Sequence, residues 1–229
     1  VEAGALDGEF QSNTLFLEKD HGWKGLLVEP LRESHNLLKY KQRKAWTSRC
    51  CLATKPMAHQ EILYQFTSTH RGTESALRRA GSRARSALMG SLHGESSDGI
   101  EPGQKVYEQV TCLPLGSLLL ALGVRNVTFI SLDVEGSEPP VVNHFPWKDI
   151  TVDVWIVEHG VQNITDEFVT RMHTGKARRD DLSLLDLGFI DVFKDRGYVL
   201  YGASTDIRVI NYVFVRKGSH TYNRINNNR

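Results

Sequence analysis

The 229-residue chain lacks a long apolar run and has no excess of charge of either sign. Its longest apolar stretch, residues 113–124, is interrupted by Pro114, Gly116 and Gly123. It therefore stays short of the roughly 20 apolar residues that a membrane-spanning helix needs. The formal net charge of +1 at pH 7 provides no general attraction to nucleic acid or to an anionic membrane. We expect no nucleic-acid partner and no membrane contact by this stretch of chain.

Cysteine is also scarce. The three cysteines, Cys50, Cys51 and Cys112, leave at least one thiol free or paired with another chain. Cys51 and Cys112 form either a disulfide, in an oxidising compartment, or a pair of buried free thiols, and the sequence leaves both open. Two N-glycosylation sequons begin at Asn126 and Asn163, and they matter only in a secreted or lumenal protein. We expect Asn163 to be the more accessible, because Asn126 sits against a buried strand.

Two common glycine-rich nucleotide motifs are missing. The chain contains neither the G-x-G-x-x-G turn of dinucleotide-binding proteins nor the G-x-x-x-x-G-K-[ST] loop that cradles phosphates. These absences count against a dinucleotide or a nucleoside triphosphate as the ligand.

Strand-like and helix-like stretches alternate along the chain. The opening residues form an expected strand, and Ser12, Asn13 and Thr14 suit the start of a helix before Leu15. Further strands are expected at residues 23–29, 44–53, 60–69, 105–113, 128–134 and 152–157, and in the closing stretches GYVLYG and INYVFVRK. Further helices are expected at residues 31–40, 115–122 and 181–196. This order predicts an α/β fold, with a mostly parallel sheet covered by helices and an antiparallel C-terminal strand pair.

We expect one domain, residues 1–229, interrupted by an insertion. Residues 70–103 are rich in Ser, Gly and Arg and poor in large apolar side chains. They suit either a solvated surface loop or a basic lid over an acidic substrate, mobile or partly helical at Glu74–Ala87. The chain begins within an expected strand with no helix before it, so we also expect a longer parent protein.

Polar residues follow the expected strands at their carboxyl ends. They are Gly4 to Gly8 after the first strand, Glu29 after the second, Cys50 and Cys51 after the third, Asp133 and Glu135 after the fourth, and Glu158 and His159 after the fifth. Parallel sheets bind ligands beyond the carboxyl ends of their strands. Glu29 is placed to accept hydrogen bonds from a ribose diol beside the glycine turn. A nucleoside without a phosphate chain fits best, and S-adenosylmethionine is the usual example.

At these residues the sequence resembles the FkbM-type, S-adenosylmethionine-dependent methyltransferases. The resemblance rests on VEAGALDGEFQSNT, GWKGLLVEP, FISLDVEGSE and the closing strand pair, and it spans most of the chain apart from the insertion. It implies a Rossmann-like methyltransferase fold. GALDGE, SNT and GWKGLLVEP are most similar to the animal, Star-like branch, whose members are known as membrane-anchored trafficking factors of the secretory pathway.

The resemblance also implies roles for individual residues. Those expected to bind the cofactor are Glu2, Gly4, Ala5, Asp7, Gly8, Asn13, Glu29, Pro30 and Asp133. Glu29 matches the ribose-binding acid, and Asp133 and Glu135 match the D-x-E-G motif beside the reactive methyl. Glu2 departs from the pattern, because such enzymes often have Asp there. Asp7 is alternatively a simple turn residue.

The expected catalytic residues are Asp133, Glu158 and His159. Asp133, Glu135 and Glu158 together suit a divalent ion such as Mg²⁺ or Mn²⁺, which would lower the pKa of an acceptor hydroxyl. Alternatively, His159 is the general base, or it is an ordinary loop histidine.

Two functions from different classes follow. The first is O-methylation of a small molecule or glycan, in the lumen of the endoplasmic reticulum or Golgi and from a membrane-anchored parent, with the cytoplasm as the alternative location. The second is a Star-like interaction domain that binds lumenal protein cargo and keeps the fold without turnover. The near-zero net charge counts against a third reading, a nucleic-acid methyltransferase.

Overall fold

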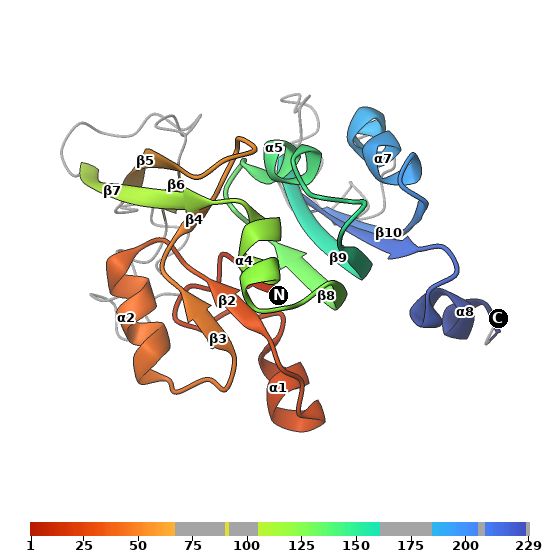
Figure 1. Ribbon diagram of the computed structural model, residues 1–229, viewed down its shortest axis with the longest axis horizontal. Helices are drawn as coiled ribbons and strands as arrows, with labels where there is room; N and C mark the ends of the chain where they lie inside the picture. The colour runs from red at the N-terminus through yellow and green to blue at the C-terminus, as the bar shows by residue number, and fades with distance from the viewer. Residues whose placement is uncertain (67–89, 92–104, 161–184, 206–208, 228–229) are drawn as a thin grey trace, which may run out of the picture. The chain divides into compact units, whose positions relative to one another are not determined.

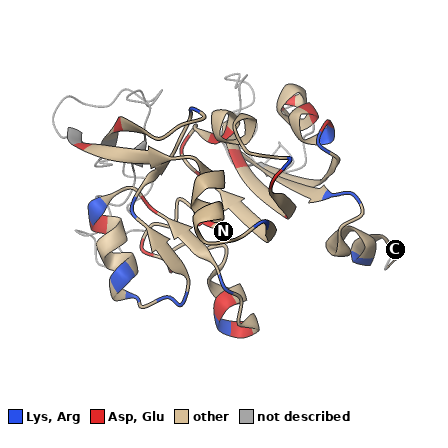
Figure 2. Ribbon diagram, in the orientation of Figure 1, with Lys and Arg blue, Asp and Glu red and all other residues tan. Residues whose placement is uncertain are grey.

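The computed structural model describes residues 1–66, 90–91, 105–160, 185–205 and 209–227 (Figure 1). The chain divides into two compact units, residues 1–115 and 116–229. Acidic and basic residues are interspersed along the described elements of each unit (Figure 2). No helix in the described parts of the chain is long and apolar enough to cross a membrane.

The first unit contains a parallel sheet of three short strands in the order β1-β2-β3. The strands are β1 (Glu2–Ala3), β2 (Leu26–Val28) and β3 (Trp46–Ser48). Helix α1 (Leu15–His21) connects β1 to β2, and helix α2 (Arg32–Tyr40) connects β2 to β3. These elements match the expected strand-helix-strand-helix-strand order.

Local sequence explains where both helices begin and end. The Ser12 hydroxyl accepts a hydrogen bond from the Leu15 N–H at 3.1 Å, which satisfies a donor that the first turn of α1 leaves unpaired. Gly22, with φ of 66°, ends α1 in the left-handed conformation that glycine adopts without strain. Leu38 of α2 is buried against Leu27 of β2, so the apolar face of α2 covers the sheet.

A second sheet of the first unit differs from the expectation of a single sheet. Its strands follow the order β4-β7-β5-β6. They are β4 (Cys51–Leu52), β5 (His59–Phe66), β6 (Gly90–Ser91) and β7 (Lys105–Leu113). The expected strand at residues 44–53 is therefore two strands in two sheets. Cys50 and Cys51 do not end the third strand, because β3 stops at Ser48 and Cys51 begins β4.

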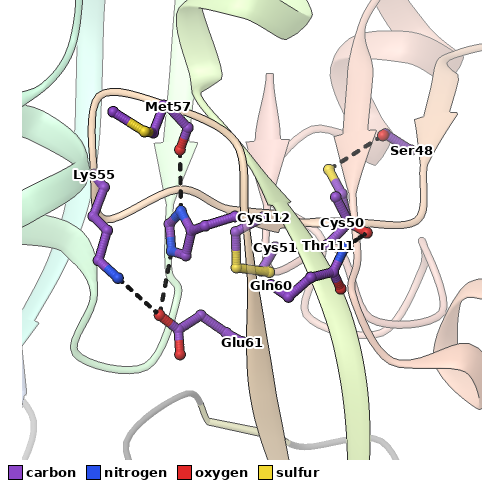
Figure 3. Close-up of a disulfide and its surroundings, with 10 residues drawn as sticks. Ser48, Cys50, Cys51, Lys55, Met57, Gln60, Glu61, Thr111 and Cys112 are labelled. Atoms are coloured by element: carbon purple, nitrogen blue, oxygen red, sulfur yellow. Dashed lines mark hydrogen bonds and ion pairs between the residues drawn. A yellow bond between two sulfur atoms is a disulfide. The ribbon is translucent and has the colours of Figure 1, made fainter.

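A disulfide joins Cys51 of β4 to Cys112 of β7 (Figure 3). The two residues are direct partners in the parallel β4–β7 ladder, and both are buried in a cluster with Leu31 and Leu63. Of the two alternatives that the sequence left open, the structure contains the disulfide. Cys50 keeps its thiol, and burial raises the pKa of that thiol, which makes it a poor nucleophile.

The strands of the second unit lie side by side in the order β8-β9-β11-β10. Its strands are β8 (Asn126–Leu132), β9 (Thr151–Gly160), β10 (Tyr198–Thr205) and β11 (Val209–Arg216). β8 and β9 are parallel, whereas β11 runs antiparallel to both β9 and β10. The prediction of an antiparallel pair at the C-terminus is therefore confirmed, as is the α/β class, with parallel pairing among β1, β2 and β3 and between β8 and β9.

The helices of this part of the chain are α4 (Leu115–Ala121), α5 (Glu138–Asn143), α7 (Leu187–Lys194) and α8 (His220–Asn227). α5 and α8 were not expected from the sequence. α7 lies inside the helix expected at residues 181–196, of which residues 181–184 are outside the described part of the chain. Phe193 of α7 stacks on Phe214 of β11, with ring centroids 3.9 Å apart, and contacts the fully buried Trp155 of β9. This aromatic core fixes α7 on the sheet.

Two further expectations concern the insertion at residues 70–103 and the two sequons. Of the insertion at residues 70–103, the structure describes only β6, so neither the lid nor its helix is tested. Asn163 also lies outside the described residues. Asn126 is exposed at the first position of β8, so the reason given for its lower accessibility is wrong, whereas the comparison with Asn163 stays a prediction.

Candidate functional site

The turn that follows β1 adopts left-handed backbone angles at three residues. The φ angles are 84° at Gly4, 47° at Leu6 and 80° at Gly8. Glycine takes such angles without strain, which explains why Gly4 and Gly8 occupy this turn. The Gly4 N–H donates to the Val28 carbonyl at 3.1 Å, so the turn is tied to the end of β2.

Two carboxylates shape the rest of this segment from inside. The Asp7 carboxylate accepts hydrogen bonds from the N–H groups of Glu9 and Phe10, which closes a local turn. The buried Glu2 carboxylate accepts three, from the N–H of Asn13 and from the hydroxyls of Ser12 and Thr14. Glu2 therefore positions the start of α1. This contact gives the longer Glu side chain a role at a position where Asp was expected.

Glu29 connects the turn to α2. Its Oε2 accepts the Leu6 N–H at 2.9 Å, and its Oε1 accepts the Leu31 N–H, also at 2.9 Å. Only 3% of Glu29 is exposed. The structure thus brings the glycine turn and Glu29 into direct contact, as their positions at the ends of neighbouring parallel strands predicted. Pro30 follows Glu29 directly, before α2 begins.

Arg43 holds the turn from the other side, and the sequence analysis missed it. Its guanidinium donates to the Gly8 carbonyl, to the Ser12 hydroxyl and to the Thr14 hydroxyl. It also forms an ion pair with Glu18 at 3.1 Å, and 2% of the Arg43 side chain is exposed. Removing one partner of such a buried pair leaves an uncompensated charge. Arg43 is therefore a fixed part of the frame around the turn.

In the second unit, Glu138 organises the loop after β8. Its Oε1 accepts the Val134 N–H at 2.7 Å and the Gly136 N–H at 3.3 Å. Glu135 and Gly136 take positive φ angles of 57° and 94°, so the loop turns back on itself over this carboxylate. Glu138 was part of the quoted motif but had no role assigned.

Desolvation and the nearby Asp133 charge raise the pKa of two carboxyl groups of this loop. Desolvation, together with the Asp133 charge, raises the pKa of Glu135 to about 7, although part of Glu135 is exposed. The pKa of Glu138 also rises to about 7, mainly through desolvation and further through Asp133, despite the backbone N–H donors that oppose the shift. Near neutral pH, Glu135 and Glu138 are therefore each partly protonated.

Because of Glu138, the free energy of unfolding should fall as the pH rises from 4.5 to about 7. In that window the folded chain holds a proton that the unfolded chain has released, so raising the pH favours unfolding, by up to about 3 kcal/mol. Glu138→Gln, which stays neutral, should flatten this slope in urea denaturations at several pH values. The exposed Glu33→Gln on α2 is the control. A variant at Glu138 that keeps the wild-type slope would contradict the assignment.

Glu158 and His159 lie within β9 rather than after it. They pair with Asn211 and Ile210 of β11, which extends the strand beyond its expected end at Val157. Successive side chains of a strand point to opposite faces. Glu158 and His159 therefore project to different sides of the sheet, and the loop that begins at Asp133 follows the neighbouring parallel strand.

The buried His159 pairs with Asp186, the half-buried N-cap residue of α7. Its Nε2 lies 3.0 Å from Asp186 Oδ2, and its ring stacks on Phe189 with centroids 4.4 Å apart. Desolvation acts to raise the pKa of Asp186, but hydrogen bonds from the Phe189 N–H and from His159 outweigh it and lower the pKa. Tyr212 completes the cluster, because its hydroxyl accepts the Asp186 N–H at 2.8 Å. A sequence signal for Asp186 existed, since Asp is a favoured N-cap residue.

The divalent-ion prediction has no support in the structure. Among the described residues, no group of three or more His, Cys, Asp or Glu side chains is arranged to hold a metal ion. Asp133, Glu135 and Glu158, the three residues of that prediction, do not form such a group. We derive no step through a metal ion.

The residues above fall within a recognised family pattern. The family model described as the methyltransferase FkbM domain matches residues 2–200, which includes the glycine turn, Glu29, the loop after β8 and the end of β9. No curated protein and no solved structure matches the chain. The match to the family model covers most of the chain and implies use of S-adenosylmethionine. Together with the α/β architecture, it establishes that the chain belongs to the FkbM methyltransferase family, with a Rossmann-like methyltransferase fold.

Proposed function

We propose that the protein transfers a methyl group from S-adenosylmethionine to a hydroxyl of a small molecule or glycan. The observation that carries the cofactor half of this proposal is the contact between Glu29 and the glycine turn, through the Leu6 N–H. A buried carboxylate at the end of the second parallel strand is a suitable acceptor for two ribose hydroxyls. The family match supports methyl transfer in general.

The residues of the first unit fit a nucleoside ligand. The Leu6 and Leu31 N–H groups fix the two carboxylate oxygens of Glu29 beside the turn, and a carboxylate is an acceptor that suits ribose hydroxyls. Gly4 and Gly8 take positive φ angles in this turn, and a Cβ at Gly8 would lie 3.2 Å from Leu38 Cγ, so glycine at that position lets the turn pack closely against α2. Glu2, Asp7 and Asn13 support this turn, and we assign them to the cofactor side as supporting residues.

His159 is the proposed general base. Asp186 is a carboxylate that only accepts, so the proton shared with it sits on His159 Nε2 and leaves Nδ1 as the proton acceptor. S-adenosylmethionine supplies an electrophilic methyl. The acceptor oxygen forms its bond to the methyl carbon as the carbon–sulfur bond breaks, and the hydroxyl proton passes to His159 Nδ1.

The His159–Asp186 pair favours a hydroxyl over an amine as the acceptor. An alcohol oxygen becomes a good nucleophile only as its proton leaves, so it needs a base in the transition state. A neutral amine attacks with its own lone pair and loses its proton afterwards. Asp133 and Glu158 remain the alternative bases, and variants of each separate them from His159.

Glu29→Ala should weaken S-adenosylmethionine binding by a factor of roughly ten to several hundred. Each charge-assisted hydrogen bond that is lost is worth about 1.5–3 kcal/mol. Since Glu29 also accepts the Leu6 and Leu31 N–H groups, the variant should unfold at a lower temperature as well. Calorimetry with S-adenosylmethionine and S-adenosylhomocysteine, below the melting temperature of the variant, measures the loss.

Glu33→Ala is the matched control, because it removes the same charge from an exposed position on α2. Its affinity should equal that of the wild type. If the wild type binds neither nucleoside, the cofactor assignment fails. If it binds them but methylates none of the glycans and polyols offered, the second function is preferred: a Star-like interaction domain, for which capture of lumenal cargo is the next test.

A further inference from the structure

We propose that Asn126 carries an N-linked glycan, and that the domain folds in an oxidising lumen. Asn126-Val127-Thr128 is a complete sequon, because the middle residue is not proline. The proposal is independent of methyl transfer. It concerns how and where the chain matures.

The geometry of β8 presents both ends of the sequon to solvent. Asn126 and Thr128 are exposed, and the intervening Val127 is buried, as the alternation of a strand requires. The Thr151 hydroxyl donates to Asn126 Oδ1 at 2.6 Å. This bond uses the amide oxygen and orients the side chain. Among the described residues, no hydrogen bond involves Asn126 Nδ2, the atom that receives the sugar.

A glycan at this position leaves the candidate site of the second unit uncovered. Asn126 is the first residue of β8, whereas the loop that begins at Asp133 follows its last residue. Seven residues of extended strand separate the two ends by about 20 Å. The sugar would therefore stand at the amino edge of the strand, away from Glu138 and His159.

The disulfide supplies the independent argument for the compartment. Cys51 and Cys112 are buried partners in the β4–β7 ladder. Disulfides of this structural kind form and persist in secretory compartments and are rare in the cytosol. The same compartments contain the machinery that glycosylates sequons. An exposed sequon and a core disulfide in one chain thus point to one environment.

The chemical step is transfer of an oligosaccharide from a polyprenyl pyrophosphate donor. A bond forms between Asn126 Nδ2 and the anomeric carbon of the first sugar, and the bond from that carbon to the pyrophosphate oxygen breaks. The pyrophosphate leaves with the electron pair, and the amide nitrogen loses one proton. The donor is supplied by the compartment.

The test uses the complete natural gene product, expressed in animal cells with no added targeting sequence. All versions carry Asn163→Gln, which removes the other sequon. Peptide N-glycosidase treatment in ¹⁸O-labelled water converts a glycosylated Asn126 to labelled Asp, which mass spectrometry detects. We expect label at Asn126 and a matching gel shift in the parent version.

Thr128→Ser and Thr128→Ala form a matched pair. Both shorten the same exposed side chain, but only Ser keeps a sequon. Thr128→Ser should retain the glycan and Thr128→Ala should lose it. After enzymatic deglycosylation, both variants should have the melting temperature of the deglycosylated parent. An unmodified Asn126 in the parent version overturns the proposal, and so does a gel shift that survives Thr128→Ala.

Discussion

His159→Gln should lower the rate of methyl transfer by about 10²–10⁴-fold, the range for losing a general acid–base group. Glutamine can still hydrogen-bond to Asp186, but its amide does not accept a proton at neutral pH. The affinity for S-adenosylmethionine should change little, because Glu29 and the glycine turn set it. The measurement is tritiated methyl transfer from S-adenosylmethionine to a panel of glycans and polyols, alongside calorimetry of cofactor binding.

Asp186→Asn tests the same pair without touching the histidine. Asn is a good N-cap, so its side-chain oxygen keeps the bond from the Phe189 N–H that begins α7. Its amide group, however, donates toward His159 Nε2. The ring proton then moves to Nδ1, and the base is lost, so the turnover rate should fall within the same 10²–10⁴-fold range with the Michaelis constant for the cofactor unchanged.

Asp191→Asn is the control on the same helix, because Asp191 is exposed and forms an exposed ion pair with Lys194 at 3.1 Å. It should behave as the wild type. If His159→Gln retains the wild-type rate, the base is another group, and Asp133→Asn and Glu158→Gln identify it. Whichever of these two variants loses about 10²–10⁴-fold in rate marks the base. If both variants keep the wild-type rate, none of the predicted residues is the base.

The strands that flank the site were predictable because they are short apolar runs bounded by polar residues. Leu26–Val28 and Ile130–Leu132 are buried, and each is followed at once by an acid. Neighbouring parallel strands end at one edge, so Glu29 and the turn beginning at Gly4 had to be close. The sequence therefore sufficed for the fold class and for this contact.

The division of residues 44–53 into β3 and β4 was not readable locally. The run is β-prone throughout, and its break depends on the pairing of Cys51 with Cys112, which lies 61 residues further along the chain. The end of β9 was misjudged for a similar reason. Glu158 and His159 look like loop residues until β11 pairs with them.

The supporting residues of the site were missed because their types usually belong to the surface. Arg43 is a charged residue in a polar stretch, yet it is buried against Gly8 and Glu18. Glu138 begins α5. Two consecutive prolines follow it, and they made a helix unexpected here, although proline is tolerated in a first helical turn. Such roles depend on partners that only the folded chain brings together.

Loss of the Cys51–Cys112 disulfide should lower the free energy of unfolding by about 4 kcal/mol. A cross-link stabilises a protein mainly by restricting its unfolded chain, and the effect grows with the length of the closed loop. Here the two cysteines are 61 residues apart, and the loop includes β5, β6 and most of β7. The double variant Cys51→Ala, Cys112→Ala should show this loss in urea denaturation under non-reducing conditions.

The wild type in the presence of a reductant should approach the stability of the double variant, which should itself be insensitive to the reductant. Cys50→Ala is the control, because this buried cysteine is outside the disulfide; its sulfur lies 3.3 Å from the Ser48 hydroxyl. Its stability should still depend on the reductant. Titration of the unfolded, non-reduced wild type should find one thiol among the three cysteines. Three reactive thiols, with a urea midpoint that the reductant does not move, would contradict the disulfide and remove the argument for an oxidising compartment.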